Sequence, residues 1–147
     1  MDAAEFSEDR DDWLDLLMST VVGPKLGAGQ LTFLHDYPAS QAALARLKPG
    51  DPSVAERFEI YLKGIELANG FHELANAQEQ RKRFEADLQT RQARGLEKLP
   101  IDERLLEALG AGLPECSGIA LGFDRVVMLA AGAKHIDEVL AFPLERA

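Results

Sequence analysis

Residues 57–74 read RFEIYLKGIELANGFHEL, and this stretch decides the fold. Apolar and polar side chains partly alternate over residues 57–62, which favours a β-strand. Lys63 and Gly64 form a tight connection, and residues 65–72 are typical of a second strand. The stretch therefore predicts two antiparallel strands joined by a short turn.

Outward from this hairpin, the chain mixes helices and strands without a βαβ rhythm. Asp9 or Asp11 caps an expected first helix, which ends before Gly23 and whose apolar positions recur at helical spacing: Trp13, Leu16, Leu17 and Val21. Further helices are expected over residues 41–47, 77–94, 103–109 and 126–131. We also expect a buried strand at 31–35, a loop at 36–40 and a strand at 138–142. This order predicts a single α+β domain over residues 1–147, with an antiparallel sheet flanked by helices.

Composition narrows the class of protein. A chain of 147 residues fits one domain with a real core. No apolar run approaches the ~20 residues that a membrane span needs, and the first ten residues are acidic, so we expect a cytoplasmic protein. The one cysteine, Cys116, excludes an intramolecular disulfide and a cysteine-based zinc cluster. The formal net charge of -9 argues against broad nucleic-acid binding, but it suits carboxylates that hold a cationic substrate or magnesium.

Three glutamates seven residues apart, Glu59, Glu66 and Glu73, suggest a first site. One helix would place them on one face, but Gly64 and Gly70 disfavour that helix. On two hairpin strands, a carboxylate from each can converge with Asn69 on a hard cation such as Mg²⁺. The alternative is that these glutamates sit on strand edges and face water.

A second pattern lies where a strand is expected to pass into a helix. Gly118 and Gly122 let the backbone approach a flat ligand, and Arg125 at the start of a helix can pair with phosphate oxygens. The helix N-terminus adds a favourable partial charge. The alternative is a packed strand followed by an Asp124 cap and a surface arginine.

These two patterns resemble a known family. Residues 117–128, SGIALGFDRVVM, resemble motif 3 of class II aminoacyl-tRNA synthetases. Residues 57–74 resemble the strand pair that precedes it in the lysine-specific enzymes, and the resemblance covers roughly residues 31–147. Ala120, where true lysyl-tRNA synthetases typically have glycine, makes the chain most similar to the elongation factor P–lysine ligases, as do residues 80–87 and 138–147.

The resemblance implies a role for each matched residue. Glu59 and Glu66 would hold Mg²⁺, while ATP would be contacted by Glu66, Leu67, Asn69, Gly122 and Arg125. Glu73 would receive the side-chain ammonium of lysine or (R)-β-lysine, and Ala120 would narrow the pocket beside it. Arg125 would be the catalytic residue, because the reaction depends on positioning and charge neutralisation. Elongation factor P would accept the lysine, and tRNA is not an expected partner.

The chain departs from the family in one respect. Motif 1, at the dimer interface, and motif 2, with an arginine on the α-phosphate, are not found. We therefore expect an excised fragment or a truncated gene product that is inactive alone and associates with itself through an uncovered sheet. Two other functions stay open, a fragment of a true lysyl-tRNA synthetase and a non-catalytic binding domain that kept this fold.

Overall fold

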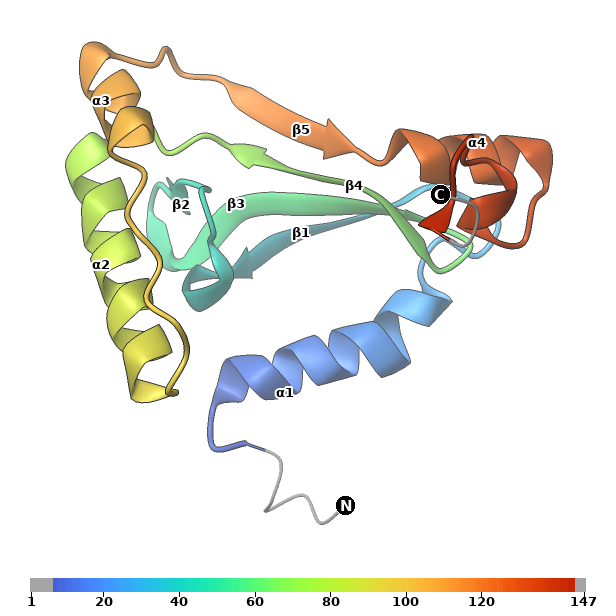
Figure 1. Ribbon diagram of the computed structural model, residues 1–147, viewed down its shortest axis with the longest axis horizontal. Coiled ribbons are helices and arrows are strands. Elements are labelled where there is room, and N and C mark those ends of the chain that lie inside the picture. The colour runs from blue at the N-terminus through green and yellow to red at the C-terminus, as the bar shows by residue number, and fades with distance from the viewer. Residues whose placement is uncertain (1–6, 145–147) are drawn as a thin grey trace.

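A four-stranded antiparallel path with one short side strand forms the centre of the molecule (Figure 1). The computed structural model describes residues 7–144. The strands follow the order β1 (Thr32–Pro38), β3 (Asp51–Leu62), β4 (Ile65–His72) and β5 (Ser117–Leu121), and β2 (Leu47–Lys48) pairs with β3 beside this path. The predicted α+β class with an antiparallel sheet is confirmed.

The predicted β3–β4 hairpin is confirmed, and its strand 65–72 has the predicted bounds. Both turn residues have positive φ, 52° at Lys63 and 73° at Gly64. A side chain on Gly64 would also come within 2.7 Å of the Pro24 carbonyl oxygen, so this position requires glycine. A register shift between Ile60 and Tyr61 marks a bulge near the turn.

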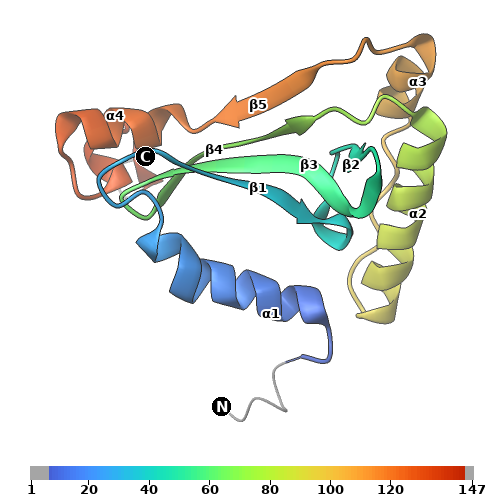
Figure 2. The ribbon, with the colours of Figure 1, turned by 180° about the vertical axis from the view of Figure 1, so that it is seen from behind.

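The helices lie at the ends and along one side of the sheet, as Figures 1 and 2 show. Helix α1 (Arg10–Leu17) continues as a π-helical turn (Met18–Val22) and a short 3₁₀ turn (Gly23–Lys25). Helices α2 (Ala77–Ala93) and α3 (Glu103–Ala111) pack together at one end, and α4 (Phe123–Ala131) lies at the other. A last 3₁₀ turn covers Ile136–Glu138.

The helix boundaries follow from capping. The Asp9 carboxylate accepts a hydrogen bond from the Asp11 amide, and the Asp102 carboxylate accepts one from the Leu105 amide, as the sequence predicts. Gly95, with φ 69°, follows the last residue of α2 in the left-handed conformation that ends helices. Two boundaries differ from the prediction, because α3 runs through Gly110 to Ala111 and α4 begins at Phe123.

The helix predicted over residues 41–47 is wrong. Only a 3₁₀ turn at Ala39–Gln41 forms there, and the chain then runs along the sheet. The Arg46 amide donates to the His72 carbonyl at 2.8 Å, and the Leu74 amide donates to the Leu44 carbonyl at 3.0 Å. A helix this short is marginal without tertiary packing, and here the sheet competes successfully for its backbone groups.

Three predictions about strands also need correction. The predicted loop 36–40 is instead strand as far as Pro38, with a register shift at Asp36, whose φ is 64°. The predicted strand 31–35 does form, but it is not buried, since Phe33 is 57% exposed. No strand forms over residues 138–142, all of which the structure describes. Glu138 instead ends the 3₁₀ turn Ile136–Glu138, and its carboxylate caps the start of that turn through the amides of Lys134 and His135.

One face of the sheet carries large exposed apolar side chains. The register places Phe33, Ile60, Ala68 and Leu121 opposite one another across the four strands, on the face away from Glu59. Phe33 and Leu121 are both 57% exposed. We call this surface the apolar face. Within residues 7–144, no helix is long and apolar enough to cross a membrane.

We predict that the chain associates with itself through the apolar face, because contiguous exposed apolar surface favours contact between proteins. Light scattering should give an apparent mass that rises above the monomer with concentration. The double variant Phe33→Thr, Leu121→Thr should reduce this rise, because threonine keeps strand propensity and removes apolar area. Leu96→Thr, an exposed leucine beyond α2, serves as the control and should leave the rise unchanged. A wild-type chain that stays monomeric at high concentration would contradict the prediction.

Candidate functional site

The face of the sheet opposite the apolar face holds most of the predicted site residues. Glu59 on β3 lies opposite Asn69 on β4, and Asn69 lies opposite Ala120 on β5. Directly opposed residues point to the same face, so these three side chains form a row across the sheet. The register thus brings together a predicted metal ligand, a predicted nucleotide contact and a predicted substrate contact.

A neighbouring row brings in Glu73. Arg57 lies opposite Phe71, and Phe71 lies opposite Gly118. A Cβ atom built on Gly118 would lie 2.2 Å from Oε1 of Glu73, so the Glu73 carboxylate rests directly against this glycine. The backbone holds Glu73 there, since its amide donates to the Cys116 carbonyl at 3.0 Å. Glu73 is therefore one row away from Ala120, on the same face.

Glu59 is a buried carboxylate, 8% exposed, with a hydrogen-bond donor on each oxygen. Arg57 donates from Nη2 to Oε1 at 2.7 Å, and the Tyr61 hydroxyl donates to Oε2 at 2.6 Å. A buried charge without such partners would be strongly unfavourable. The residues at 57, 59 and 61 share a face through the two-residue period of the strand, and this explains how one strand supplies all three groups.

Two tyrosines surround this carboxylate. Burial raises the pKa of the Tyr61 hydroxyl far above its ordinary value, and its hydrogen bond to Glu59 raises it further. Burial also raises the pKa of Tyr37, with Glu59 contributing next. Both phenols therefore stay protonated at any physiological pH. The buried Tyr37 hydroxyl has no hydrogen-bond partner among the described residues, and the guanidinium of Arg57 lies 4.4 Å from the centre of its ring.

A cavity of about 500 Å³ opens between this face and the end of α1. It is lined by Glu59 and Tyr61 from β3, by Glu66 from β4, by Arg125 from α4, and by Asp15 and Ser19 from the first helical segment. Its volume lies within the ~300–1,000 Å³ that is usual for ligand sites. Glu59, Glu66 and Arg125, predicted from distant parts of the sequence, thus meet in one hollow.

Arg125 lies against the backbone of β4. Its Nη1 donates to the carbonyl oxygen of Glu66 at 2.7 Å and lies 3.8 Å from the carboxylate of the same residue. Gly122 permits this arrangement, because a Cβ atom there would lie 3.3 Å from Cδ of Arg125. The Gly122 amide donates to the Leu67 carbonyl at 2.8 Å, so Leu67 contributes its backbone while its side chain is buried.

The two glutamates of the cavity could bind a magnesium ion only together with ligands from outside the protein. Glu59 and Glu66 line the same cavity, but no cluster of three or more Asp, Glu, His or Cys side chains that could hold a metal occurs within residues 7–144. Mg²⁺ is commonly bound by one or two carboxylates, with phosphate oxygens and water completing its shell. The donor set therefore fits magnesium that arrives with a polyphosphate.

The structure adds residues that the sequence interpretation missed. Arg57 and Tyr61 could have been found, because they flank Glu59 at a spacing of two residues in a predicted strand. Asp15 and Ser19 reach the cavity only through the placement of the first helix, and no sequence pattern signals this. Five of the eight predicted site residues are not among those that line the cavity: Leu67, Asn69, Glu73, Ala120 and Gly122. Glu73 and Ala120 lie farther along the same face.

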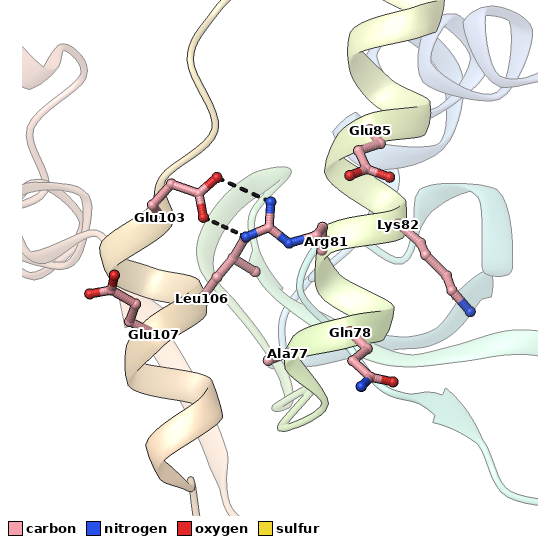
Figure 3. Close-up of a pocket in the computed structure, with 8 residues that line it drawn as sticks. All are labelled: Ala77, Gln78, Arg81, Lys82, Glu85, Glu103, Leu106 and Glu107. Carbon is pink, nitrogen blue, oxygen red and sulfur yellow. Dashed lines mark hydrogen bonds and ion pairs between the residues drawn. The ribbon is translucent and has the colours of Figure 1, made fainter.

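A second hollow, of about 430 Å³, lies between α2 and α3 (Figure 3). Arg81 points from α2 toward Glu103 on α3 and donates from Nη1 to its Oε1 at 3.1 Å. None of the predicted site residues lines it. Arg81 and Glu103 pair across the two helices, so we regard it as a helix-packing groove.

Comparison with known proteins identifies the family and its relatives. Residues 20–146 match the model of the class II tRNA synthetases (D, K and N). The chain is 59% identical over 146 residues to the elongation factor P–(R)-β-lysine ligase of Vibrio cholerae, which covers 99% of this chain and 45% of that protein. The ligase of the same name from Klebsiella pneumoniae strain 342 is 60% identical over 144 residues, 98% of this chain and 44% of that one. The chain therefore spans about 45% of the length of these relatives.

We predict that Gly118→Ala displaces Glu73, because the new methyl group would overlap the carboxylate. Binding of a cationic amino acid, measured by NMR titration, should weaken at least tenfold if that carboxylate is its partner, since about 1.4 kcal/mol of lost interaction suffices. Gly110→Ala is the matched control, because nothing lies within 4 Å of that position in α3. It should leave binding unchanged and raise the free energy of unfolding by about 0.4–1 kcal/mol. Equal binding by both variants would show that Glu73 is not part of a ligand site.

Proposed function

Because the chain belongs to the class II tRNA synthetases (D, K and N), we propose that it is part of an ATP-dependent ligase that activates lysine or (R)-β-lysine. The activated group would pass to a lysine of elongation factor P. The observation that carries the proposal is the convergence of Glu59, Glu66 and Arg125 on one cavity, in a chain about 60% identical to the ligases that are named for this reaction.

The nucleotide would occupy the cavity between β3, β4 and α4. Glu59 and Glu66 would hold Mg²⁺, which supplies charge neutralisation for the phosphates. Arg125 is close enough to exchange its contact with the Glu66 carbonyl for a phosphate oxygen. Leu67 and Gly122 are joined by a backbone hydrogen bond, and the absence of a side chain at Gly122 would let a purine approach the backbone there.

The amino acid would lie farther along the same face. Glu73 would receive its side-chain ammonium, and an ion pair is stronger in such a sheltered place than in open water. Ala120, in the adjacent row, adds one methyl group to the floor of this region. A methyl-sized difference is worth only ~1–3 kcal/mol, so Ala120 would bias the choice between lysine and (R)-β-lysine.

The proposed reaction has two steps. A carboxylate oxygen of the amino acid attacks the α-phosphorus of ATP, the bond from that phosphorus to the bridging oxygen breaks, and pyrophosphate leaves with the electron pair. An unprotonated lysine amine of elongation factor P then attacks the acyl carbon of the adenylate, AMP leaves, and the new amide loses a proton. This chain's residues would position and neutralise charge, with no covalent intermediate on the protein.

The charge of the chain favours a protein acceptor over tRNA. At a net charge of -9, the chain lacks the excess of lysine and arginine that phosphate-backbone recognition requires. In the described basic run 81–83, Arg81 is paired with Glu103 and Arg83 with Glu79. A lysyl-tRNA synthetase fragment is the competing proposal, and charging of tRNA with lysine by a longer polypeptide that contains this chain would favour it.

Titration of the chain with ATP and magnesium, and separately with lysine and (R)-β-lysine, tests the proposal. NMR shift changes detect weak complexes, with dissociation constants up to ~1 mM and above, and are therefore suited to a chain that spans about 45% of its relatives. We expect both ligand classes to bind, each at its own group of residues. If neither ligand binds, to the chain or to a longer polypeptide that contains it, the catalytic proposal fails.

Glu73→Gln should separate the two parts of the site. The amide keeps the size of the side chain but loses the charge that would pair with an ammonium. We predict that amino-acid binding weakens by at least tenfold, whereas ATP binding changes less than twofold. Glu115→Gln is the control, because that exposed glutamate pairs with Arg46 outside the cavity. An equal loss of both ligands in Glu73→Gln would show that the residue has been assigned to the wrong ligand.

A further inference from the structure

One guanidinium connects four segments beneath the cavity. Arg57 donates from Nη2 to Glu59 at 2.7 Å, from Nε to Oδ1 of Asn69 at 3.2 Å, and from Nη1 to the carbonyl oxygen of Gln41 at 3.0 Å. Its plane lies over the ring of Tyr37 on β1. All three of its nitrogens are therefore engaged, in the fixed fork geometry that lysine cannot reproduce.

These contacts determine which way the Asn69 amide points. The Nε group of arginine carries a hydrogen and has no acceptor capacity, so the atom that faces it must be the oxygen of the amide. The NH₂ group of Asn69 is consequently turned away from Arg57. A divalent cation on that oxygen would lie beside the guanidinium and be repelled by it.

The Arg57 guanidinium also holds the Glu59 carboxylate in place. With Arg57 on one oxygen and Tyr61 on the other, the Glu59 carboxylate cannot rotate without breaking a short hydrogen bond. Oε2, whose donor is the neutral Tyr61 hydroxyl, keeps a second lone pair for a metal ion on the side away from the guanidinium. Arg57 also supplies the positive charge that makes a buried carboxylate tolerable when no metal is bound.

We propose that Arg57 is the positioning residue of this site, which fixes Glu59 as a magnesium ligand and orients Asn69 as a hydrogen-bond donor to an anionic oxygen of the substrate. This proposal rests on the proposed function and adds which atom of Asn69 meets the ligand. Asn69 recognises a phosphate oxygen of the nucleotide through its NH₂ group, and the amide oxygen is not a ligand of the metal. Arg57 does not touch substrate, because its nitrogens are committed and its side chain is 19% exposed.

The first experiment measures ATP binding by NMR titration, with and without magnesium, for the wild type, Arg57→Met and Arg57→Lys. Loss of a group that orients a metal ligand typically weakens binding by about 10–100-fold, and we expect Arg57→Met to lose this much in magnesium. Arg57→Lys should recover part of the loss, since it restores a charge beside Glu59 but cannot reach three acceptors at once. It also serves as the folded variant if Arg57→Met is unstable.

Arg46→Met is the matched control. Arg46 also joins two carboxylates, Glu56 at 2.7 Å and Glu115 at 3.0 Å, but it lies outside the cavity. It should lower the unfolding temperature while leaving ATP binding within twofold of the wild type. If Arg57→Met binds ATP as the wild type does, or loses no more than Arg46→Met, then Arg57 is only a structural residue and the proposal is overturned.

The second experiment replaces the outward NH₂ group of Asn69. Asn69→Asp keeps an oxygen for Arg57 but presents a charged oxygen to the ligand, so binding of ATP with magnesium should weaken about 10-fold or more. In the Arg57→Met background this penalty should shrink, because the amide is then free to rotate. Unchanged or tighter binding in Asn69→Asp would mean that residue 69 faces the metal with an oxygen, and would overturn the assignment.

The two proposals fail in different ways. A wild-type chain that binds ATP with magnesium, together with variants at residues 57 and 69 that bind it equally well, removes the positioning role and leaves the proposed function intact. A wild-type chain that binds no ATP overturns the nucleotide site itself, and the role of Arg57 with it.

Discussion

The buried ion pair between Arg57 and Glu59 is the constraint on which the rest of the site depends. Two opposite charges on one strand that are largely removed from water are stable only if they pair and if further hydrogen bonds support both groups. Tyr61, Asn69 and the Gln41 carbonyl supply those partners from β3, β4 and the turn after β1. The requirement ties three segments to one point, so that the carboxylate facing the cavity is held by the sheet and not by a mobile loop.

The second constraint is that side chains must lie close to the backbone. Glycine permits this at Gly118 in β5 and at Gly122 just after it. Gly118 leaves space for the Glu73 carboxylate, and Gly122 lets Arg125 lie against β4. These glycines leave space for the side chains of Glu73, just after β4, and Arg125, in α4, and the chain around the glycines adopts ordinary extended or helix-start conformations. The sheet therefore acts as a template, on which acidic and basic groups from residues 59 to 125 meet within one face.

The residues on this face do not by themselves complete a magnesium site, and the ligands would have to supply the missing groups. Two carboxylates in the cavity are fewer than an all-protein magnesium cage would supply, and Arg125 rests on a backbone carbonyl. Phosphate oxygens would satisfy both groups, so the nucleotide would be the part that joins them. This reasoning agrees with membership of the class II tRNA synthetases. Arg57 is largely buried and each of its nitrogens donates a hydrogen bond, so it can support groups that must exchange partners.

The sequence alone determined the hairpin of residues 57–72, the long helix of residues 77–93, the capped helix after Asp102 and the strand-to-helix junction at Gly122. Each depends on local periodicity, turn residues or caps, which act over a few residues. Tertiary structure decided the rest. Residues 41–47 do not form a helix because the sheet provides partners for their backbone groups, and the Glu138 carboxylate caps a 3₁₀ turn through hydrogen bonds to two backbone amides. Arg57 binds both Glu59 and Asn69, and Asp15 lines the cavity. These arrangements depend on contacts between distant segments, and no local sequence pattern encodes them.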